Sequence, residues 1–350
     1  METRVCCLHS KGDIQIETHA VAAPGQGEVL VAIGAAGICG SDLHYFQNGG
    51  FGTIRVREPM ILGHEAAGTV VAIGEGVDNV EPGTRVAVNP SNPCNDCVYC
   101  NQGMPIHCLN MRFSGSAMRF PHEQGLFREK IVVEAARCVP VKDGPSLSEA
   151  ACSEPLAVCL HARSVAGELT GKRVLVTGAG PIGALCAGLA KDGGASEVVV
   201  TDLQDFPLEV AAKMGATRTI NIVNAADAME PYMADKGYFD VVFECSAAAP
   251  ALKTALMALR PRGTLVQVGI AGDQPIPINL VVSKEISIKG TQRFHSEFAE
   301  AVEMISQGRI DVRPIVTQTC KMTDAESAFV LAADRTKAVK VHLTFAGEGT

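Results

Sequence analysis

The sequence contains no apolar run long enough to cross a membrane, because Lys, Asp, Gly or Pro interrupts every hydrophobic stretch. The stretch from Met1 to Glu17 also lacks the charged and then apolar pattern of a secretory signal. Basic residues are sparse as well: the net charge is −8, and no cluster of Lys and Arg alternates with aromatic residues. These absences argue against a membrane or nucleic-acid partner and predict a cytoplasmic protein.

The chain is large enough to bury an extensive interior. Its 350 residues are long for one hydrophobic core, so we expect two domains. Cysteine is abundant, with 13 residues, but a disulfide scaffold is not expected in a chain of this size without a secretion signal. Most of these cysteines stand singly among apolar residues, where a thiol usually acts as a small buried hydrophobe.

One tight group of cysteines is different, and it consists of Cys94, Cys97, Cys100 and Cys108. Two-residue gaps let consecutive sulfurs converge on one ion, and four thiolates form the tetrahedral ligand set of a closed zinc site. Such a site leaves no position for a substrate. The spacing therefore predicts a structural zinc, and four unconnected buried cysteines are the less favoured alternative.

Up to about residue 150, Gly and β-branched residues predict an irregular, mostly β domain. The expected strands are Val29–Ala35, Gly68–Ile73, Arg85–Val88 and Lys130–Glu134. A helix is expected over Ser148–Ala166, with Ser148 as its cap and with Pro155 marking a kink or a helix start.

Farther along, short apolar strands alternate with helices, which indicates a parallel sheet covered on both faces. The expected strands are Arg173–Thr177, Glu197–Thr201, Asp240–Cys245, Thr264–Val268 and Ile286–Lys289. The expected helices are Ile182–Lys191, Pro207–Met214, Pro250–Leu259, Ser296–Ile305 and Asp324–Ala333. A closing strand at Val339–Phe345 precedes a frayed tail, Ala346–Thr350. The sequence thus predicts an α/β protein.

A glycine-rich turn joins the first of these strands to the first helix and contains Gly178, Gly180, Pro181, Ile182 and Gly183. Gly178 permits a tight turn, Gly180 lets the backbone approach a pyrophosphate, and Gly183 allows close packing of helix and strand. Asp202, at the end of the next strand, is placed to accept hydrogen bonds from the adenosine ribose. Because positions 203–205 offer no Arg or Lys for a 2′-phosphate, we expect NAD to be preferred over NADP. A glycine turn without a nucleotide is the less favoured alternative.

A catalytic zinc requires mixed ligands and an open coordination position. The candidate ligands are Cys39, His64, Glu65 and Glu154. Taken singly, His64 is better explained as a satisfied core histidine, and Glu154 as a carboxylate at a helix start. Their occurrence together with a nucleotide-binding pattern favours the metal site, and the choice between Glu65 and Glu154 stays open.

The order and spacing of these motifs resemble the zinc-containing medium-chain alcohol/polyol dehydrogenase family along the whole chain. The motifs that carry the resemblance are Gly37–His44, Gly63–Gly68, Cys94–Cys108, Glu154–Ala157 and Gly178–Gly183. The resemblance implies a GroES-like catalytic domain, residues 1–150 and 291–350, split around a Rossmann NAD-binding domain, residues 151–290. It implies an active site between them, with catalytic zinc on Cys39, His64 and either Glu154 or Glu65. It also implies a homodimer or homotetramer paired through strands near Thr264–Lys289.

The activity implied by the resemblance is hydride transfer between a secondary alcohol carbon and nicotinamide. Zinc lowers the pKa of the substrate hydroxyl, Ser41 receives the proton, and His44 carries it to solvent. Glu65 and Glu154 belong to the same catalytic set. The alternatives are that Ser41 merely caps a turn and that His44 is a surface residue.

The sorbitol-type branch is indicated by Ser41–Tyr45 and by the Glu154-Pro-Leu motif. Within this branch, the segments Met111–His122 and Gln292–Phe294 are most similar to enzymes that oxidise the C5 hydroxyl of a sugar acid. A sugar acid brings a carboxylate, so we expect a cation at the site. The expected substrate contacts are Tyr45, Arg112, His122 and Arg293, with Arg119 either nearby or in a solvated loop. A sorbitol or xylitol dehydrogenase is the nearest alternative, and a catalytically silent zinc- and NAD-binding sensor is a remote one.

Overall fold

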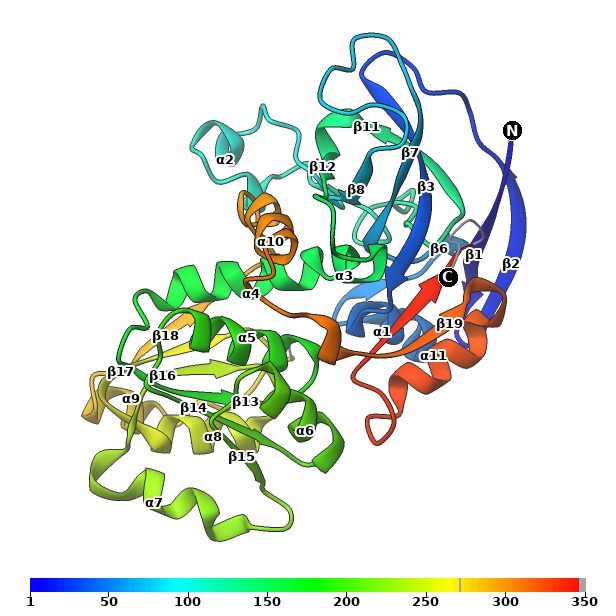
Figure 1. Ribbon diagram of the computed structural model, residues 1–350. Helices are drawn as coiled ribbons and strands as arrows, with labels where there is room; N and C mark the ends of the chain where they lie inside the picture. Colours follow the sequence, from blue (N-terminus) through cyan, green and yellow to red (C-terminus); the bar gives the residue numbers. More distant parts are fainter. Residues whose placement is uncertain (271, 346–350) are drawn as a thin grey trace.

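The computed structural model of the chain describes residues 1–270 and 272–345. Figure 1 shows two lobes: a β-rich lobe that contains both ends of the chain, and a second lobe in which helices flank a parallel sheet. In these described ranges, no helix has the length and apolarity needed to span a bilayer. The predicted frayed tail, Ala346–Thr350, lies outside the described residues.

The β-rich lobe is centred on a seven-stranded sheet with the order β12-β8-β7-β3-β20-β19, in which β11 also pairs with β3. The strands are β3 Glu28–Gly37, β7 Glu65–Ile73, β8 Arg85–Val88, β11 Lys130–Glu134, β12 Cys138–Pro140, β19 Val316–Lys321 and β20 Lys340–Thr344. A smaller sheet has the order β2-β1-β6, with β1 Glu2–Ser10, β2 Asp13–Ala20 and β6 Met60–Ile61. Short pairs are formed by β4 Gly50–Phe51 with β5 Ile54–Arg55, and by β9 Ser91–Asn92 with β10 Arg112–Phe113.

The C-terminal segment completes this lobe. Strand β20 pairs antiparallel with β3, which places His342 opposite Gly37. Helix α11 (Ala325–Ala333) contributes Phe329, whose ring centroid lies 5.2 Å from that of Phe46. Because these contacts join residues about three hundred positions apart, hydrophobic periodicity has no means of showing them.

The second lobe contains a six-stranded, all-parallel sheet with the order β15-β14-β13-β16-β17-β18. Its strands are β13 Arg173–Thr177, β14 Glu197–Asp202, β15 Arg218–Asn221, β16 Phe239–Glu244, β17 Leu259–Gln267 and β18 Ser287–Gly290. One face packs on α4 (Ser153–Ala166), α5 (Pro181–Asp192), α6 (Asp205–Met214) and α10 (Glu297–Ser306). The other face packs on α7 (Glu230–Met233), α8 (Ala249–Ala258) and α9 (Ile278–Ser283). Consecutive residues of β13 serve different cores, with Val174 on the first face and Leu175 on the second.

The predicted helix over Ser148–Ala166 is in fact two helices, α3 (Leu147–Ala151) and α4 (Ser153–Ala166), separated at Cys152. The predicted cap was wrong, because Ser146 rather than Ser148 accepts the N–H of Glu149 in a capping box. Pro155 lies in the first turn of α4, where its missing N–H leaves no hydrogen bond unmade. This break puts Glu154 at the N-terminal end of a helix.

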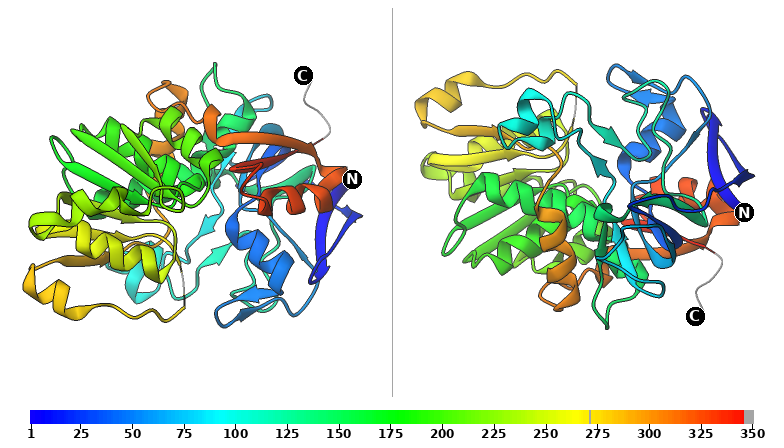
Figure 2. Two further views of the ribbon diagram at one scale, coloured as in Figure 1. Left: turned by 90° about the horizontal axis from the view of Figure 1, so that it is seen from below. Right: turned by 90° about the horizontal axis from the view of Figure 1, so that it is seen from above.

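Helix α10 falls within the range predicted for the catalytic domain, but it packs on the helices of the second lobe. Phe294 and Phe298 stack at 5.6 Å between ring centroids, and they lie in the same hydrophobic cluster as α4 and α5. Figure 2 shows α10 (orange) beside the helices of the parallel sheet in both views. The packing boundary therefore falls after the predicted division at residue 290, and that division stays a prediction.

Candidate active site

The thiol of Cys39 stands at the start of a helix. Strand β3 ends at Gly37, and α1 (Gly40–Asn48) begins after Cys39, whose backbone N–H donates to Asp42 Oδ2 at 3.0 Å. Burial, together with the negative charge of Glu65, raises the pKa of Cys39 to about 12. A thiol in this setting needs a cation beside it in order to ionise at neutral pH.

His64 lies next to Cys39 through a shared carboxylate. Asp42 is fully buried, and its Oδ1 accepts the N–H of Gly63 at 3.3 Å while its Oδ2 holds Cys39. The same Oδ1 lies 3.8 Å from His64 Nδ1, which is beyond hydrogen-bond length. His64 Nδ1 is therefore a buried polar atom without a partner among the described residues.

Glu65 is held by a buried lysine. Lys340 Nζ, on β20, lies 2.8 and 2.7 Å from the two Glu65 oxygens and also donates to the carbonyl of Ile38 at 3.2 Å. Burial opposes ionisation of Glu65, yet the positive charge of Lys340 holds the pKa of that carboxyl below its usual range. Glu65 is thus a carboxylate with both oxygens occupied.

Glu154 is in the opposite situation. Its side chain is buried at the start of α4, and none of the side-chain hydrogen bonds among the described residues involves its carboxylate. Burial raises the pKa of Glu154 to about 8, and the negative charges of Glu65 and Cys39 act in the same direction. A buried carboxyl that has no hydrogen-bond partner and lies near His64 is suited to bind a metal ion.

The donor chemistry of this cluster fits zinc. Ligand atoms of Cys39, His64 and Glu65 lie within 4.8 Å of one another. Sulfur, imidazole and carboxylate are the ligands that a catalytic zinc takes while keeping one position open. The unpaired Nδ1 of His64 supports a metal site independently of these distances, because a buried ring nitrogen normally has a hydrogen-bond partner.

The four clustered cysteines converge on one point. Sγ atoms of Cys97 and Cys100 lie 3.5 Å apart, and those of Cys94 and Cys108 lie 3.4 Å apart, in the loop around α2 (Val98–Asn101). Backbone N–H groups point at the sulfurs, for example those of Cys94 and Asn110 toward Cys108. Backbone donation, led by Asp96, lowers the pKa of Cys94 to about 6. Four sulfurs surrounded by donors suit a closed thiolate site.

The glycine-rich turn has the geometry of an anion site. Gly178 adopts φ 88°, which favours glycine, and its N–H donates to the carbonyl of Thr201. A side chain on Gly183 would overlap the carbonyl of Gly178, so the helix can approach the strand only with glycine there. Pro181 and Ile182 begin the first turn of α5, and the free N–H groups at such a helix start are suited to binding an anion.

Asp202 stands at the end of β14 beside this turn. Its Oδ2 accepts the N–H of Ala179 at 2.7 Å and also lies 2.7 Å from Arg335 Nη2. Positions 203–205 offer no cation, as noted from the sequence, but Arg335 supplies one from the loop between α11 and β20. No local sequence pattern could have shown this pairing.

Arg293 lies near His64 through the ring of Phe113, and Tyr45 lies on α1. The Arg293 guanidinium sits 4.1 Å from the centroid of the Phe113 ring, which in turn lies 5.4 Å from the ring of His64. Burial lowers the pKa of Arg293, while the charge of Glu154 raises it, which shows that the two charges are near one another. The hydroxyl of Tyr45 accepts the N–H of Ala117 at 3.2 Å.

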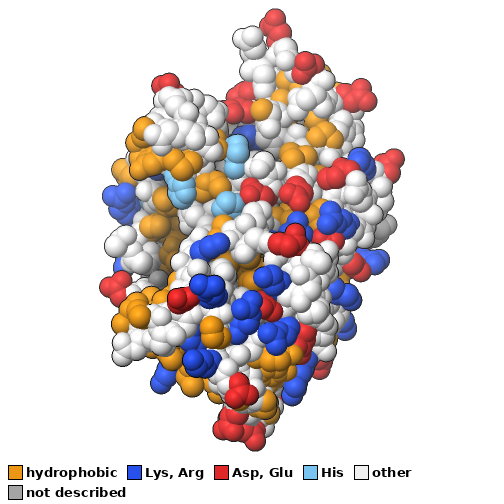
Figure 3. Space-filling model, turned by 90° about the vertical axis from the view of Figure 1, so that its left-hand side faces the viewer, with side chains coloured by type: hydrophobic (Ala, Val, Ile, Leu, Met, Phe, Trp, Pro, Cys, Tyr) orange, Lys and Arg blue, Asp and Glu red, His pale blue; other side chains and the backbone are white. Residues whose placement is uncertain are grey.

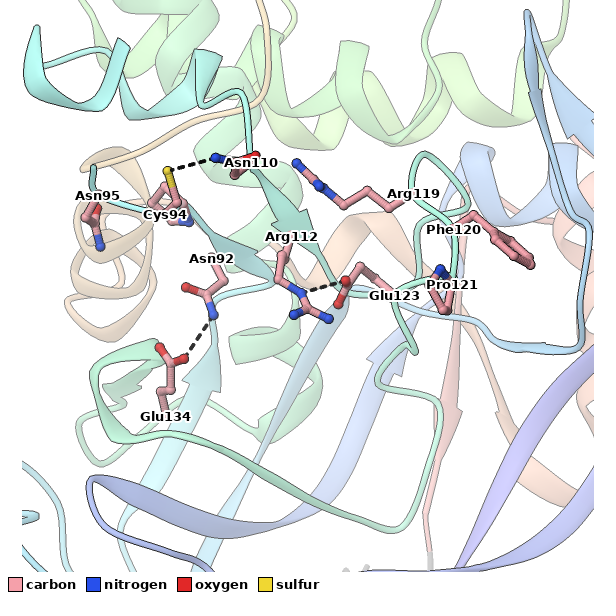
Figure 4. Close-up of a pocket in the computed structure, with 11 residues that line it drawn as sticks. Asn92, Cys94, Asn95, Asn110, Arg112, Arg119, Phe120, Pro121, Glu123 and Glu134 are labelled. Atoms are coloured by element: carbon pink, nitrogen blue, oxygen red, sulfur yellow. Dashed lines mark hydrogen bonds and ion pairs between the residues drawn. The ribbon is translucent and has the colours of Figure 1, made fainter. Parts of the chain in front are cut away.

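Two other expected substrate contacts do not find support. Arg112 pairs with Glu123 at 2.7 Å in a hollow of about 710 Å³ whose lining includes Cys94 but not Cys39, His64 or Glu154. Figure 4 shows both side chains in this hollow, with Arg119 at its edge. Arg119 itself donates to the carbonyls of Met111 and Leu109.

His122 is likewise occupied by the protein. Its Nε2 accepts the N–H of Arg57 at 2.8 Å, so Nδ1 carries the proton and donates to the carbonyl of Arg119 at 2.7 Å. A ring with both nitrogens used by the backbone offers nothing to a substrate. Its role is to fix the loop that follows Phe120.

Ser41 and His44 follow Cys39 on α1. Ser41 is half-buried and His44 is exposed, with its ring centroid 5.9 Å from that of Phe51. Cys39 and Ser41 are thus both half-buried, and His44, farther along α1, is exposed. Sequence reasoning missed the supporting residues Asp42, Lys340, Arg335 and His342. The partners of Lys340, Arg335 and His342 lie on other elements, whereas Asp42 also caps its own helix at Cys39.

Comparison with known proteins agrees with this geometry. The alcohol dehydrogenase GroES-like domain family matches residues 25–143, and the zinc-binding dehydrogenase family matches residues 181–307. An Escherichia coli (strain K12) protein named L-idonate 5-dehydrogenase (NAD(P)(+)) is 41% identical over 99% of both chains. The crystal structure of L-idonate 5-dehydrogenase from Escherichia coli K-12 has a TM-score of 0.94 at 40% identity and covers 99% of both chains.

A sorbitol dehydrogenase of Bacillus subtilis (strain 168) is also similar, with 35% identity over 93% of this chain and 92% of its own. Matches of this extent confirm the predicted GroES-like and Rossmann fold class as well as the resemblance. The chain belongs to the zinc-containing medium-chain alcohol/polyol dehydrogenase family, and it is an oxidoreductase whose cofactors are zinc and a nicotinamide dinucleotide.

Proposed function

We propose that this protein is a cytoplasmic L-idonate 5-dehydrogenase, which oxidises the C5 secondary hydroxyl of L-idonate to give 5-keto-D-gluconate with NAD, and catalyses the reverse reaction. The observation that carries this proposal is the 41% identity, over 99% of both chains, to the Escherichia coli enzyme of that name. The site adds a cation, Arg293, close to the zinc cluster through Phe113. A guanidinium at this place suits the carboxylate of a sugar acid.

In this proposal, Cys39, His64 and Glu154 hold the catalytic zinc. Glu65 has ligand atoms within 4.8 Å of those of Cys39 and His64, but it is assigned to the ion pair with Lys340. The choice of Glu154 rests on hydrogen bonding: Lys340 occupies both oxygens of Glu65, whereas the described residues place no such partner on Glu154. Zinc, when bound, acts as a Lewis acid that lowers the pKa of the substrate hydroxyl. Asp42 fixes the relative positions of the two loops that carry Cys39 and His64.

Proton removal is assigned to α1. The Ser41 hydroxyl both accepts and donates, so it can take the substrate proton while passing its own toward His44. His44 is exposed and exchanges that proton with water. Tyr45 lies on the same helix, and its hydroxyl accepts a hydrogen bond from the N–H of Ala117. The ring is therefore fixed in position and lines the substrate site.

The dinucleotide is assigned to the second lobe. Gly178, Gly180 and Gly183 let its pyrophosphate approach the first turn of α5, where Pro181 and Ile182 begin the helix. The Asp202 carboxylate accepts hydrogen bonds from the adenosine ribose hydroxyls. The nicotinamide, when bound, accepts the hydride from the C5 carbon.

A substrate panel tests the assignment. Turnover of L-idonate, D-gluconate, sorbitol and xylitol is compared by kcat/KM with NADH absorbance as the readout, and we expect L-idonate to be preferred. Preference for sorbitol or xylitol would instead support a polyol dehydrogenase, for which the Bacillus subtilis relative is the precedent. A chain that binds zinc and NAD but turns over none of these substrates would support the sensor alternative.

We also propose a homodimer or homotetramer. Strand β18 is the edge of the parallel sheet, and all four of its residues are exposed. Nearby apolar side chains, Ile278 and Val282 of α9, are exposed as well. Figure 3 shows this side of the molecule, on which hydrophobic side chains lie among Lys and Arg in the lower half. An open strand edge with apolar neighbours suits pairing with a second copy, and light scattering on the purified protein should show a mass of two or four chains.

A further inference from the structure

Arg335 lies inside the dinucleotide site although it belongs to the other lobe. Its Nη2 is 2.7 Å from Asp202 Oδ2 and 4.0 Å from the place that a Cβ on Gly180 would take. Only 2% of the Asp202 side chain is exposed, against 50% for Arg335. The guanidinium therefore stands at the open side of Asp202, between the carboxylate and the glycine-rich turn.

The turn that carries Arg335 is built by local hydrogen bonds. Asp334 Oδ1 accepts the backbone N–H of Thr336 at 3.1 Å and its hydroxyl at 2.6 Å, and Oδ2 pairs with Lys337 at 2.9 Å. These contacts fix the backbone on both sides of Arg335. The guanidinium is thus presented to Asp202 from a defined loop.

The Asp202 carboxylate has no spare acceptor position. Its Oδ1 accepts the N–H groups of Leu203 at 2.7 Å and Gln204 at 3.1 Å, and its Oδ2 accepts those of Ala179 and Arg335. A carboxylate offers about four acceptor positions. Three of these four donors are backbone groups fixed by the strand end and the turn, so ribose hydroxyls can enter only where Arg335 now lies.

We propose that Arg335 is a cofactor-specificity residue: it competes with the ribose hydroxyls of NAD for Asp202, and it binds the 2′-phosphate of NADP. The proposal rests on the proposed function in one respect, namely that a dinucleotide places its adenosine ribose at Asp202. A guanidinium binds phosphate oxygens in pairs and offsets the repulsion that a carboxylate exerts on them. The site accordingly accepts NADP as well as NAD, with a cation that stands 133 residues from Asp202 in the sequence.

The test uses two ligands that do not react. Binding of 5′-AMP and of adenosine 2′,5′-bisphosphate to the zinc-loaded protein is measured by calorimetry for the wild type, Arg335→Ala and Arg335→Lys. We expect Arg335→Ala to weaken the bisphosphate by about tenfold or more, while 5′-AMP binds equally well or more tightly. Arg335→Lys should fall between, because it keeps the charge and loses the paired donors. The ratio of kcat/KM for NADP to that for NAD should fall in parallel.

Arg262→Ala is the matched control, since this exposed arginine pairs with Glu285 away from the glycine-rich turn. Equal weakening of both ligands by Arg335→Ala would overturn the proposal, because it would place Arg335 on the shared 5′-phosphate. Unchanged binding of both ligands would overturn it too. If the wild type binds neither ligand, the assignment of the ribose to Asp202 fails as well, whereas inactivity on L-idonate with the expected binding pattern removes only the substrate proposal.

Discussion

Lys340 Nζ lies 2.7 and 2.8 Å from the two oxygens of Glu65, and both side chains are almost completely buried. Lys340 comes from β20 and Glu65 from the first position of β7, on either side of β3. The pair therefore links the C-terminal strand to the residue that follows His64. A buried pair of this kind is costly to break, because the remaining charge has neither water nor a partner.

We accordingly expect Lys340→Met to lower the free energy of unfolding by about 3–5 kcal/mol. The double variant Lys340→Met with Glu65→Gln should recover much of that loss, since no unpaired charge remains. Urea unfolding of the wild type, both single variants and the double variant measures the coupling. Additive losses in this cycle would show that the two residues do not act as a pair.

Removal of the Arg293 guanidinium should discriminate between acid and neutral substrates. A charge-assisted hydrogen bond contributes about 1.5–3 kcal/mol, so we expect Arg293→Ala to lower kcat/KM for L-idonate by about ten- to a hundredfold. The loss on sorbitol should be smaller by about tenfold. Arg112→Ala, whose guanidinium pairs with Glu123 in a separate hollow, should leave both substrates unaffected. Equal losses on L-idonate and sorbitol for Arg293→Ala would contradict a carboxylate-binding role.

The cysteine quartet should carry one zinc that takes no part in catalysis. Cys97→Ser removes one of four thiolates, so we expect zinc content to fall from about two to about one per subunit. The melting temperature should fall with it, while the remaining active fraction keeps its KM. Cys320→Ser, a half-buried cysteine outside the quartet, is the control. Zinc content that stays at two in Cys97→Ser would contradict the assignment.

Loss of the Ser41 hydroxyl should affect proton transfer alone. We expect Ser41→Ala to lower kcat by about a hundredfold or more, with zinc content unchanged. His44→Asn should have a smaller effect that high concentrations of imidazole buffer reverse, because exposed His44 can be replaced by a solvent base. A Ser41→Ala variant with wild-type kcat would rule out the relay.

A buried histidine makes stability depend on pH. Burial and the charge of Lys340 lower the pKa of His342 to about 3, and its Nδ1 lies 2.8 Å from the Ser148 hydroxyl. In the unfolded chain His342 is protonated below about pH 6.5, whereas in the folded protein it is protonated only below about pH 3. Stability is therefore complete above pH 6.5 and is lost as the pH falls toward 3, by up to about 1.4 kcal/mol per pH unit.

Urea unfolding at pH 7, 6 and 5 measures this dependence. His342→Asn should show a flatter profile than the wild type when zinc content is matched, whatever its absolute stability. Parallel profiles for the two proteins would mean that His342 is not the group responsible.

Local patterns predicted the elements well where one segment decides its own structure. The strand Arg173–Thr177 and the glycine turn after it lie at the predicted place, because apolar β-branched residues and Gly178 specify them directly. The sequence predicted a kink or a helix start at Pro155, and a helix does begin nearby, at Ser153, with the break at Cys152. The position of the break places Glu154 in the first turn of α4, and it depends on tertiary contacts that no local pattern specifies.

Contacts between side chains from distant segments are the other feature that local patterns do not specify. Arg112 and His122 stand in a segment that resembles a substrate loop, but Glu123 and the backbone of Arg57 occupy them. Arg335 is the opposite case: it contacts Asp202, although no residue near it in the sequence indicates this contact. Spacing along the chain shows which residues are available for a site, and contacts between distant segments decide which of them are free to act.

The insertion of β20 beside β3 has a consequence for how the protein comes into being. A nascent chain that has left the ribosome only up to residue 320 already contains every proposed zinc ligand and the whole parallel sheet. It still lacks Lys340 to neutralise Glu65, and it lacks the strand that pairs with the final residues of β3. Synthesis of residues 321–345 is thus the event that completes the catalytic lobe, and metal bound before that moment would be held by an incomplete site.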